Sequence, residues 1–141
     1  KGIAADVWSV TSFNELRRDG LACERTALLS ATEQPPVPWV TRQLADSEGP
    51  IVATTDHMKT YAEQIRAFIP EGRRYRTLGT DGFGRSDSRE NLRRFFEVDW
   101  QHVAWAAASE LVRSGALKAA DLEQWRSELN IDAAKPDPLY S

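Results

Sequence analysis

The sequence predicts an α/β fold in which a mostly parallel sheet carries helices on both faces. Three short apolar runs have the length and the β-branched or aromatic content of buried strands: residues 5–10 (ADVWSV), 50–55 (PIVATT) and 74–79 (RYRTLG). Each run is followed by a segment with a helix-start signal and apolar residues spaced by three and four. This alternation of strand and helix is typical of a parallel sheet.

Composition indicates one soluble domain. The chain has 141 residues, of which 41% are hydrophobic and 28% are charged, enough for a single core. Its net charge of −3 argues against nucleic acid as a partner. Cys23 is the only cysteine, so no internal disulfide can form, and we expect an inert core thiol. Because no apolar run approaches the ~20 residues needed to cross a bilayer, we expect a cytoplasmic protein without a membrane partner.

The first strand run leads into a helix with a clear start. Ser12 and Glu15 have the spacing of a capping box, in which each side chain accepts from the backbone amide of the other residue. Apolar residues then recur on one face as far as Ala27. Gly20 lies on that face and weakens the helix by ~1 kcal/mol relative to alanine, so the helix could break there.

The second and third runs are also followed by helices. Thr55 and Asp56 are the expected N-cap of the second helix, which Pro70 ends. Its apolar stripe comprises Met58, Tyr61, Ala62, Ile65, Phe68 and Ile69. The third helix starts near Ser88, where Asp87 and Glu90 repeat the capping-box spacing.

Three further helices are expected. Pro38 occupies a first helical position, Asp99 caps a long helix that ends at Gly115, and the last helix carries Trp125. The stripe of the long helix comprises Trp100, Val103, Ala104, Ala107, Ala108 and Leu111. Trp105 falls outside this stripe and is expected to face another domain or subunit. The proline-containing tail, residues 132–141, is expected to be an extended surface arm.

A glycine-rich stretch follows the third strand run, at the sheet edge where open parallel sheets bind ligands (LGTDGFGRSDSRENLRRFF, residues 78–96). Arg85 and Arg89, with helix amides, could hold a phosphate or carboxylate. However, Asp87 stands where the dinucleotide fingerprint needs its third glycine, and no P-loop lysine is present. Asp81 and Asp87 would also repel a phosphate. The favoured interpretation is a tight turn whose aspartates and arginines neutralise one another.

No catalytic constellation emerges from the remaining candidates. His57 follows the second strand run, where a general base could stand, but no serine or cysteine nucleophile can be assigned to it. A helix-start or interface role is favoured for His57, and a surface or packing role for His102. Two histidines and one cysteine give no metal-ligand spacing. The sequence therefore predicts no catalytic, cofactor-binding or metal-binding residues.

Several segments carry a resemblance to a known family: SVTSFNELRRDG, ERTALL with PPVPWVTRQL, TTDHMKTYAEQIRAFIP, LGTDGFGRSDSRENLRRFFEVD and LNIDAAKPDP. From near Ala5 to near Pro138, they resemble the C-terminal domain of the homodimeric bacterial pyruvate dehydrogenase family. The resemblance implies a transketolase-like C-terminal domain whose first strand and helix precede Lys1. Residues 1–118 would form this partial domain, and residues 119–141 a helical C-terminal extension.

The resemblance also implies a function. Enzymes of this family decarboxylate pyruvate on thiamine diphosphate with magnesium, and they reductively acetylate the lipoyl group of dihydrolipoamide acetyltransferase. None of the family's cofactor ligands or catalytic residues maps onto this chain, so the chain alone is expected to be inactive. Its expected role is scaffolding and dimerisation. The implied partners are the rest of its own polypeptide, a second copy and the acetyltransferase.

Within that role, the glycine-rich stretch is expected to be a structural loop that docks against a neighbouring domain. The loop residues are Gly79, Asp81, Gly82, Gly84, Arg85, Asp87 and Arg89. Two alternatives remain from other classes. The chain could be a free-standing module that binds a small anion at this edge, or a protein-interaction domain that recruits the acetyltransferase.

Overall fold

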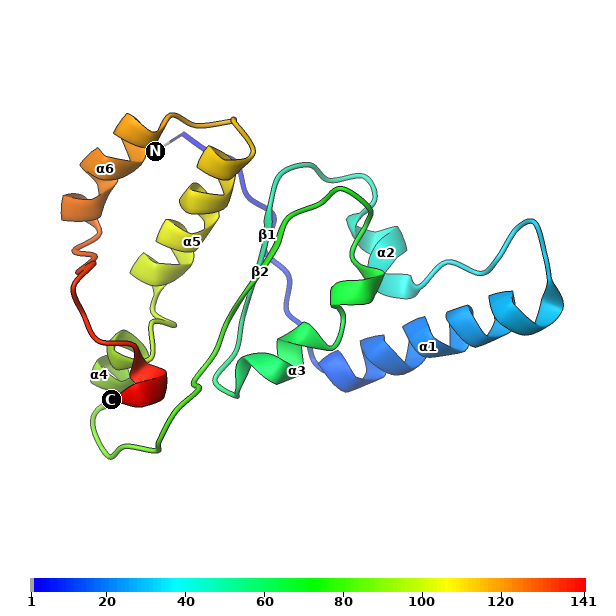
Figure 1. The fold of residues 1–141 in the computed structure, drawn as a ribbon, viewed down its shortest axis with the longest axis horizontal. Coiled ribbons are helices and arrows are strands. Elements are labelled where there is room, and N and C mark those ends of the chain that lie inside the picture. The colour runs from blue at the N-terminus through cyan, green and yellow to red at the C-terminus, as the bar shows by residue number, and fades with distance from the viewer. Residues whose placement is uncertain (1) are drawn as a thin grey trace.

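The computed structural model describes residues 2–141 as a mixed α/β fold around a small parallel sheet (Figure 1). The elements, in chain order, are α1 (Phe13–Ser30), α2 (Trp39–Leu44), β1 (Ile51–Thr54), α3 (Lys59–Glu63), the 3₁₀ turn η1 (Arg66–Phe68), β2 (Tyr75–Leu78), α4 (Arg89–Phe95), α5 (Trp100–Arg113), α6 (Ala119–Glu128) and the 3₁₀ turn η2 (Pro138–Tyr140).

The sheet pairs β1 with β2 in parallel, from Ile51 opposite Tyr75 to Thr54 opposite Leu78. Alternate residues of β2 face different helices. Tyr75 donates its hydroxyl to the Ala62 carbonyl of α3, whereas Arg76 on the other face binds Glu110 of α5. The predicted α/β class with helices on both faces is therefore confirmed, and these two strands arise from the second and third apolar runs.

The predicted strand over residues 5–10 is wrong. These residues form no strand, and Val7 is 95% exposed. An apolar run becomes a strand only when a neighbouring strand satisfies its backbone amides and carbonyls. Among residues 2–141, the sheet contains β1 and β2 alone, so this run has no pairing partner.

Helix α1 begins as predicted, because the Ser12 Oγ accepts from the Glu15 amide at 3.2 Å. The helix does not break at Gly20. Gly20 is buried, and the Phe68 ring packs where a side chain would stand. Beyond Gly20 the helix extends away from the sheet (Figure 1). There Cys23 is only half-buried and Leu28 is 82% exposed, so the expectation of a core thiol is wrong.

Two helix starts differ from the sequence prediction because their first amides or their expected caps have other partners. Pro38 is the N-cap residue of α2 instead of its first residue, and Asp19 of α1 accepts the Trp39 amide at 2.6 Å. Helix α3 begins after Met58 with no side-chain cap. Thr55 instead accepts from the His57 amide, and Asp56 forms an ion pair across the sheet edge.

The core lies between α1, α2, α3 and the sheet. Its buried cluster consists of Val40, Ile65, Phe68 and Tyr75. The predicted stripe of the second helix supplies the inner part of this core. Its outer members Met58 and Tyr61 are 52% and 44% exposed. The segment does not form one continuous helix, because α3 ends at Glu63 and the 3₁₀ turn η1 follows it.

Helices α4 and α5 are both capped by side chains. Ser88 caps α4 by accepting from the Asn91 amide, so the predicted cap at Asp87 is one residue too early. Asp99 caps α5 as predicted, accepting from the His102 amide at 2.9 Å. A carboxylate and a hydroxyl at adjacent positions are both competent caps, and backbone geometry selects between them.

The predicted stripe of α5 is wrong at its start. Trp100 is 68% exposed, whereas His102 and Glu110 are buried. Trp105 lies against α6, with the Arg126 guanidinium 5.6 Å from its ring centroid. Because the sheet and α6 both pack on α5, two faces of the helix are covered, and the partner expected for Trp105 in another domain lies in the same chain.

The tail is not the extended arm that its prolines predicted. It returns to α4 and the glycine-rich stretch (Figure 1). Lys135 donates to the Phe95 carbonyl and to Glu97, and Pro138 is buried. Within the described part of the chain, no helix is long and apolar enough to span a membrane.

Tyr75→Phe tests the link between the sheet and α3. The Tyr75 hydroxyl is a buried donor to the Ala62 carbonyl at 2.7 Å. Its removal should lower the free energy of unfolding by about 1 kcal/mol, since this buried hydrogen bond is lost. Urea denaturation followed by circular dichroism measures the loss. Tyr140→Phe, at an 83% exposed position, is the matched control and should leave stability unchanged.

Gly20→Ala tests whether packing outweighs helix propensity. Propensity alone predicts a gain of about 1 kcal/mol. A Cβ at this position would lie 2.5 Å from the Phe68 ring, and overpacking of this kind costs about 1–3 kcal/mol. We therefore expect net destabilisation in thermal unfolding. A higher melting temperature for this variant would show that Phe68 can move aside at little cost.

Candidate functional site: the glycine-rich edge of the sheet

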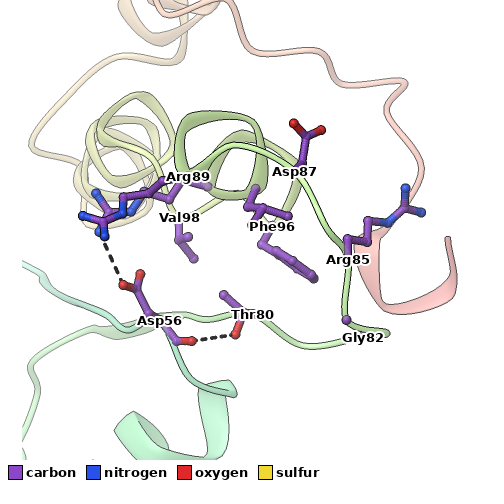
Figure 2. Close-up of a pocket in the computed structure, with 11 residues that line it drawn as sticks. Asp56, Thr80, Gly82, Arg85, Asp87, Arg89, Phe96 and Val98 are labelled. Carbon is purple, nitrogen blue, oxygen red and sulfur yellow. Dashed lines mark hydrogen bonds and ion pairs between the residues drawn. The ribbon is translucent and has the colours of Figure 1, made fainter.

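Residues 79–88 of the glycine-rich stretch form its loop, which leaves the carboxyl end of β2 and passes the carboxyl end of β1 before α4 begins. A cavity of about 480 Å³ lies between this edge and α4 (Figure 2). Its lining residues are Asp56, Thr80, Gly82, Gly84, Arg85, Asp87, Arg89, Leu92, Arg93, Phe96 and Val98. The fold thus brings most of the predicted loop residues to one place.

Gly79 lies where the stretch crosses the start of α3. The residue is buried, and a Cβ here would lie 2.6 Å from both the His57 carbonyl oxygen and the Lys59 amide nitrogen. The Thr80 amide donates to that same carbonyl at 2.9 Å, and Asp81 accepts from the Lys59 amide at 3.1 Å. Only glycine allows this close backbone approach.

The other two glycines differ from each other. Gly82 has a φ of +117°, and a Cβ there would overlap the Pro138 carbonyl oxygen of the tail. Gly84 does not have a positive φ, and a Cβ added to it would meet no atom within 4 Å. Backbone geometry therefore requires glycine at positions 79 and 82 and leaves position 84 free.

The aspartates of the stretch bind amides. Asp87 accepts from the Ser88 amide and the Asn91 side chain at 2.6 and 2.8 Å. The hydrogen bonds from Asn91 and then Ser88 hold the pKa of this carboxyl below its ordinary value. Among residues 2–141, neither Asp81 nor Asp87 forms an ion pair with an arginine. The aspartates and arginines of the loop therefore do not neutralise one another through ion pairs, contrary to the expectation from the sequence.

The arginines have separate environments. The Arg85 guanidinium stacks over the Phe95 ring at 3.9 Å, a cation–π contact. Arg93 pairs with Asp56 at 3.4 Å, which joins α4 to the end of β1. Arg89 makes no ion pair with any residue that the structure describes. Because the sequence predicts Asp56 only as a helix cap, it gives no sign of this pairing across 37 residues.

The two histidines lie apart from each other. His57 is exposed beside Tyr61, with ring centroids 5.2 Å apart. His102 is buried, and its Nδ1 lies 2.6 Å from Asp99. Within the described residues, no group of three or more His, Cys, Asp or Glu side chains could hold a metal ion.

Sequence reasoning missed the charged cluster beneath the sheet. Glu110 of α5 is buried and accepts from Arg74 at 2.6 Å and from Arg76 at 2.9 Å. The signal was the period-two spacing of these arginines, which places both on one strand face. The sequence does not single these arginines out, because nothing local indicates a buried carboxylate opposite them.

Comparison with known proteins supplies the family context. The family model described as "Transketolase-like TK C-terminal domain" matches residues 1–99. The chain is 50% identical over 138 residues to the "Pyruvate dehydrogenase E1 component" of Pseudomonas aeruginosa, covering 98% of this chain and 16% of that protein. It is 50% identical over 137 residues to the protein of the same name from Escherichia coli K12, covering 97% and 15%.

A more distant relative agrees. The "Pyruvate dehydrogenase E1 component" of Mycolicibacterium smegmatis is 45% identical over 130 residues, covering 92% of this chain and 14% of that protein. The chain therefore spans 14–16% of the length of these relatives.

Proposed function

Because this chain belongs to the transketolase-like C-terminal domain family, we propose that it is the C-terminal domain of a pyruvate dehydrogenase E1 component and serves there as a scaffold and dimerisation element. The observation that carries the proposal is the 50% identity to two such E1 components over 97–98% of this chain. In this proposal, residues 1–118 are the transketolase-like part and residues 119–141 its helical extension.

The proposed activity belongs to the whole enzyme. A pyruvate dehydrogenase E1 component would decarboxylate pyruvate on thiamine diphosphate with magnesium and pass the acetyl group to the lipoyl group of dihydrolipoamide acetyltransferase. The residues that the structure describes do not suit that cofactor. The cavity at the sheet edge includes Asp56, which would repel a diphosphate, and the described residues provide no metal-binding group.

The glycine-rich stretch supports a docking role within that enzyme. Its backbone is held by Gly79, Asp81 and Gly82, which fix its shape. Within it, Phe83 is 80% exposed. Tyr140, two residues beyond the Pro138 that lies against Gly82, is 83% exposed. Large apolar side chains presented on a rigid loop are typical of interfaces. The proposed partners are the rest of the E1 polypeptide, a second copy and the acetyltransferase, in the cytoplasm.

A domain exchange tests the scaffold role. The 137 matching residues of the Escherichia coli E1 component would be replaced by this chain. The chimera should form dimers in analytical ultracentrifugation and should reduce an artificial electron acceptor when pyruvate is supplied. A chimera that folds cooperatively but neither dimerises nor oxidises pyruvate would overturn the proposal.

Phe83→Ser tests the docking role separately. Because Phe83 is exposed, the substitution should change the stability of the 141-residue chain by no more than about 0.5 kcal/mol. In the chimera it should weaken assembly, measured as earlier dimer dissociation on dilution. Arg85→Ala should act in the same direction. Equal behaviour of the variant and parent chimeras would remove the docking role and leave the family assignment intact.

A further inference from the structure

We propose that the cavity at the glycine-rich edge binds a small monoanionic carboxylate that carries a compact apolar group, with Arg89 and Arg93 as the carboxylate donors. The proposal is independent of the scaffold role. It follows from the charge at one end of the cavity, the apolar surface at its base and its volume.

One end of the cavity has an excess of positive charge. Arg89 and Arg93 are four residues apart on α4 and therefore share a helix face. Asp56 pairs with Arg93 at 3.4 Å. Figure 2 shows Asp56 on the opposite wall and the Arg89 side chain extending toward the same end of the cavity. This end of the cavity thus carries two guanidinium groups and one carboxylate. Its net charge is +1, which is available to a ligand.

The other charged residues do not cancel this excess. Asp87 points away from the cavity in Figure 2 and already accepts from Ser88 and Asn91. Arg85 extends toward the tail and lies over the Phe95 ring. The ligand therefore meets a local charge of +1, which matches one carboxylate. Inorganic phosphate carries more negative charge and would be repelled by Asp56.

The base of the cavity is apolar. Phe96 and Val98 point into it in Figure 2, and Leu92 completes its lining. The volume of about 480 Å³ falls within the range of small-molecule sites. A guanidinium fork binds a carboxylate through two parallel hydrogen bonds, and the apolar base would take a branched or short alkyl group. Together these features select an aliphatic carboxylic acid anion.

Titration of the 141-residue chain with 4-methylpentanoate tests the proposal. Methyl resonances of Leu92 and Val98 should shift saturably, with a dissociation constant of about 1 mM because the site is open to water. The neutral analogue 4-methylpentanamide and inorganic phosphate should each bind about tenfold more weakly. Equal binding of the amide, tighter binding of phosphate, or no saturation by about 20 mM would overturn the proposal.

Variants locate the site. Arg89→Ala should weaken binding about fivefold, and Arg89→Lys should restore part of it because the charge returns without the fork. Asp56→Asn should tighten binding, since it removes the competing carboxylate. Arg42→Ala, at an exposed position on α2, is the control and should have no effect. Unchanged affinity in both Arg89→Ala and Asp56→Asn would exclude this end of the cavity.

Discussion

Gly79→Ala should destabilise the domain by about 2–4 kcal/mol, because overpacking and the loss of hydrogen bonds act together at this crossing. The added Cβ would lie 2.6 Å from the His57 carbonyl oxygen and the Lys59 amide nitrogen. Both neighbours are backbone atoms, so no side chain can rotate away. Relief requires the stretch to separate from α3, which breaks the hydrogen bonds of Thr80 to His57 and of Lys59 to Asp81.

Alanine substitutions at the other two glycines of the loop provide controls for Gly79→Ala. Gly84→Ala should be neutral or stabilising by up to about 1 kcal/mol, because alanine only restricts the unfolded chain there. Gly82→Ala should cost about 1–3 kcal/mol, since its positive φ disfavours a side chain and its Cβ would meet Pro138. Urea denaturation gives all three values. Equal urea midpoints for Gly79→Ala and Gly84→Ala would contradict the close approach of the Gly79 backbone to His57 and Lys59.

Glu110→Ala should lower the free energy of unfolding by about 2–3 kcal/mol. The Glu110 side chain is 4% exposed and joins α5 to Arg74 and Arg76 of the strand region. Its removal leaves two like charges side by side without a counterion. The expected loss stays below that for a fully buried pair because the arginines are 40% and 43% exposed and water can solvate them.

A surface pair provides the control for this variant. Glu15 and Arg18 form an ion pair with side chains 65% and 74% exposed, so Glu15→Ala should cost less than about 1 kcal/mol from that pair. Similar losses for Glu15→Ala and Glu110→Ala, measured in the same buffer, would mean that the buried cluster contributes no more than a solvated pair.

The same cluster predicts a pH dependence. Burial alone would raise the pKa of Glu110, but hydrogen bonds from Arg74 and Arg76 outweigh burial and hold that pKa below its ordinary value of 4.5. Since the folded pKa is the lower one, the contribution is complete above pH 4.5 and declines as the pH falls toward the folded value. The stability difference between the parent chain and Glu110→Gln should therefore shrink below pH 4.5. A constant difference in acid-range urea melts would contradict this linkage.

The candidate site was predictable in composition but not in its contacts. The glycine-rich stretch was located from its glycines and its position after a strand. Its partners could not be inferred, because they lie far away in the sequence. Asp56 binds Arg93, 37 residues further on, and Gly82 packs against Pro138 of the C-terminal tail. The arginines and aspartates of this segment were expected to pair with each other. In the structure the aspartates instead accept hydrogen bonds from amide groups.

The amino-acid order alone determined the features that depend on nearby residues, namely two helix caps and the positions of two strands. Ser12 and Asp99 cap their helices through amides three residues away, and the strands at Ile51–Thr54 and Tyr75–Leu78 follow from short apolar runs. The tertiary structure alone decided that Gly20 continues a helix under Phe68. It also decided that residues 5–10 form no strand in this chain, because an element that needs a distant partner exists only where the fold supplies one.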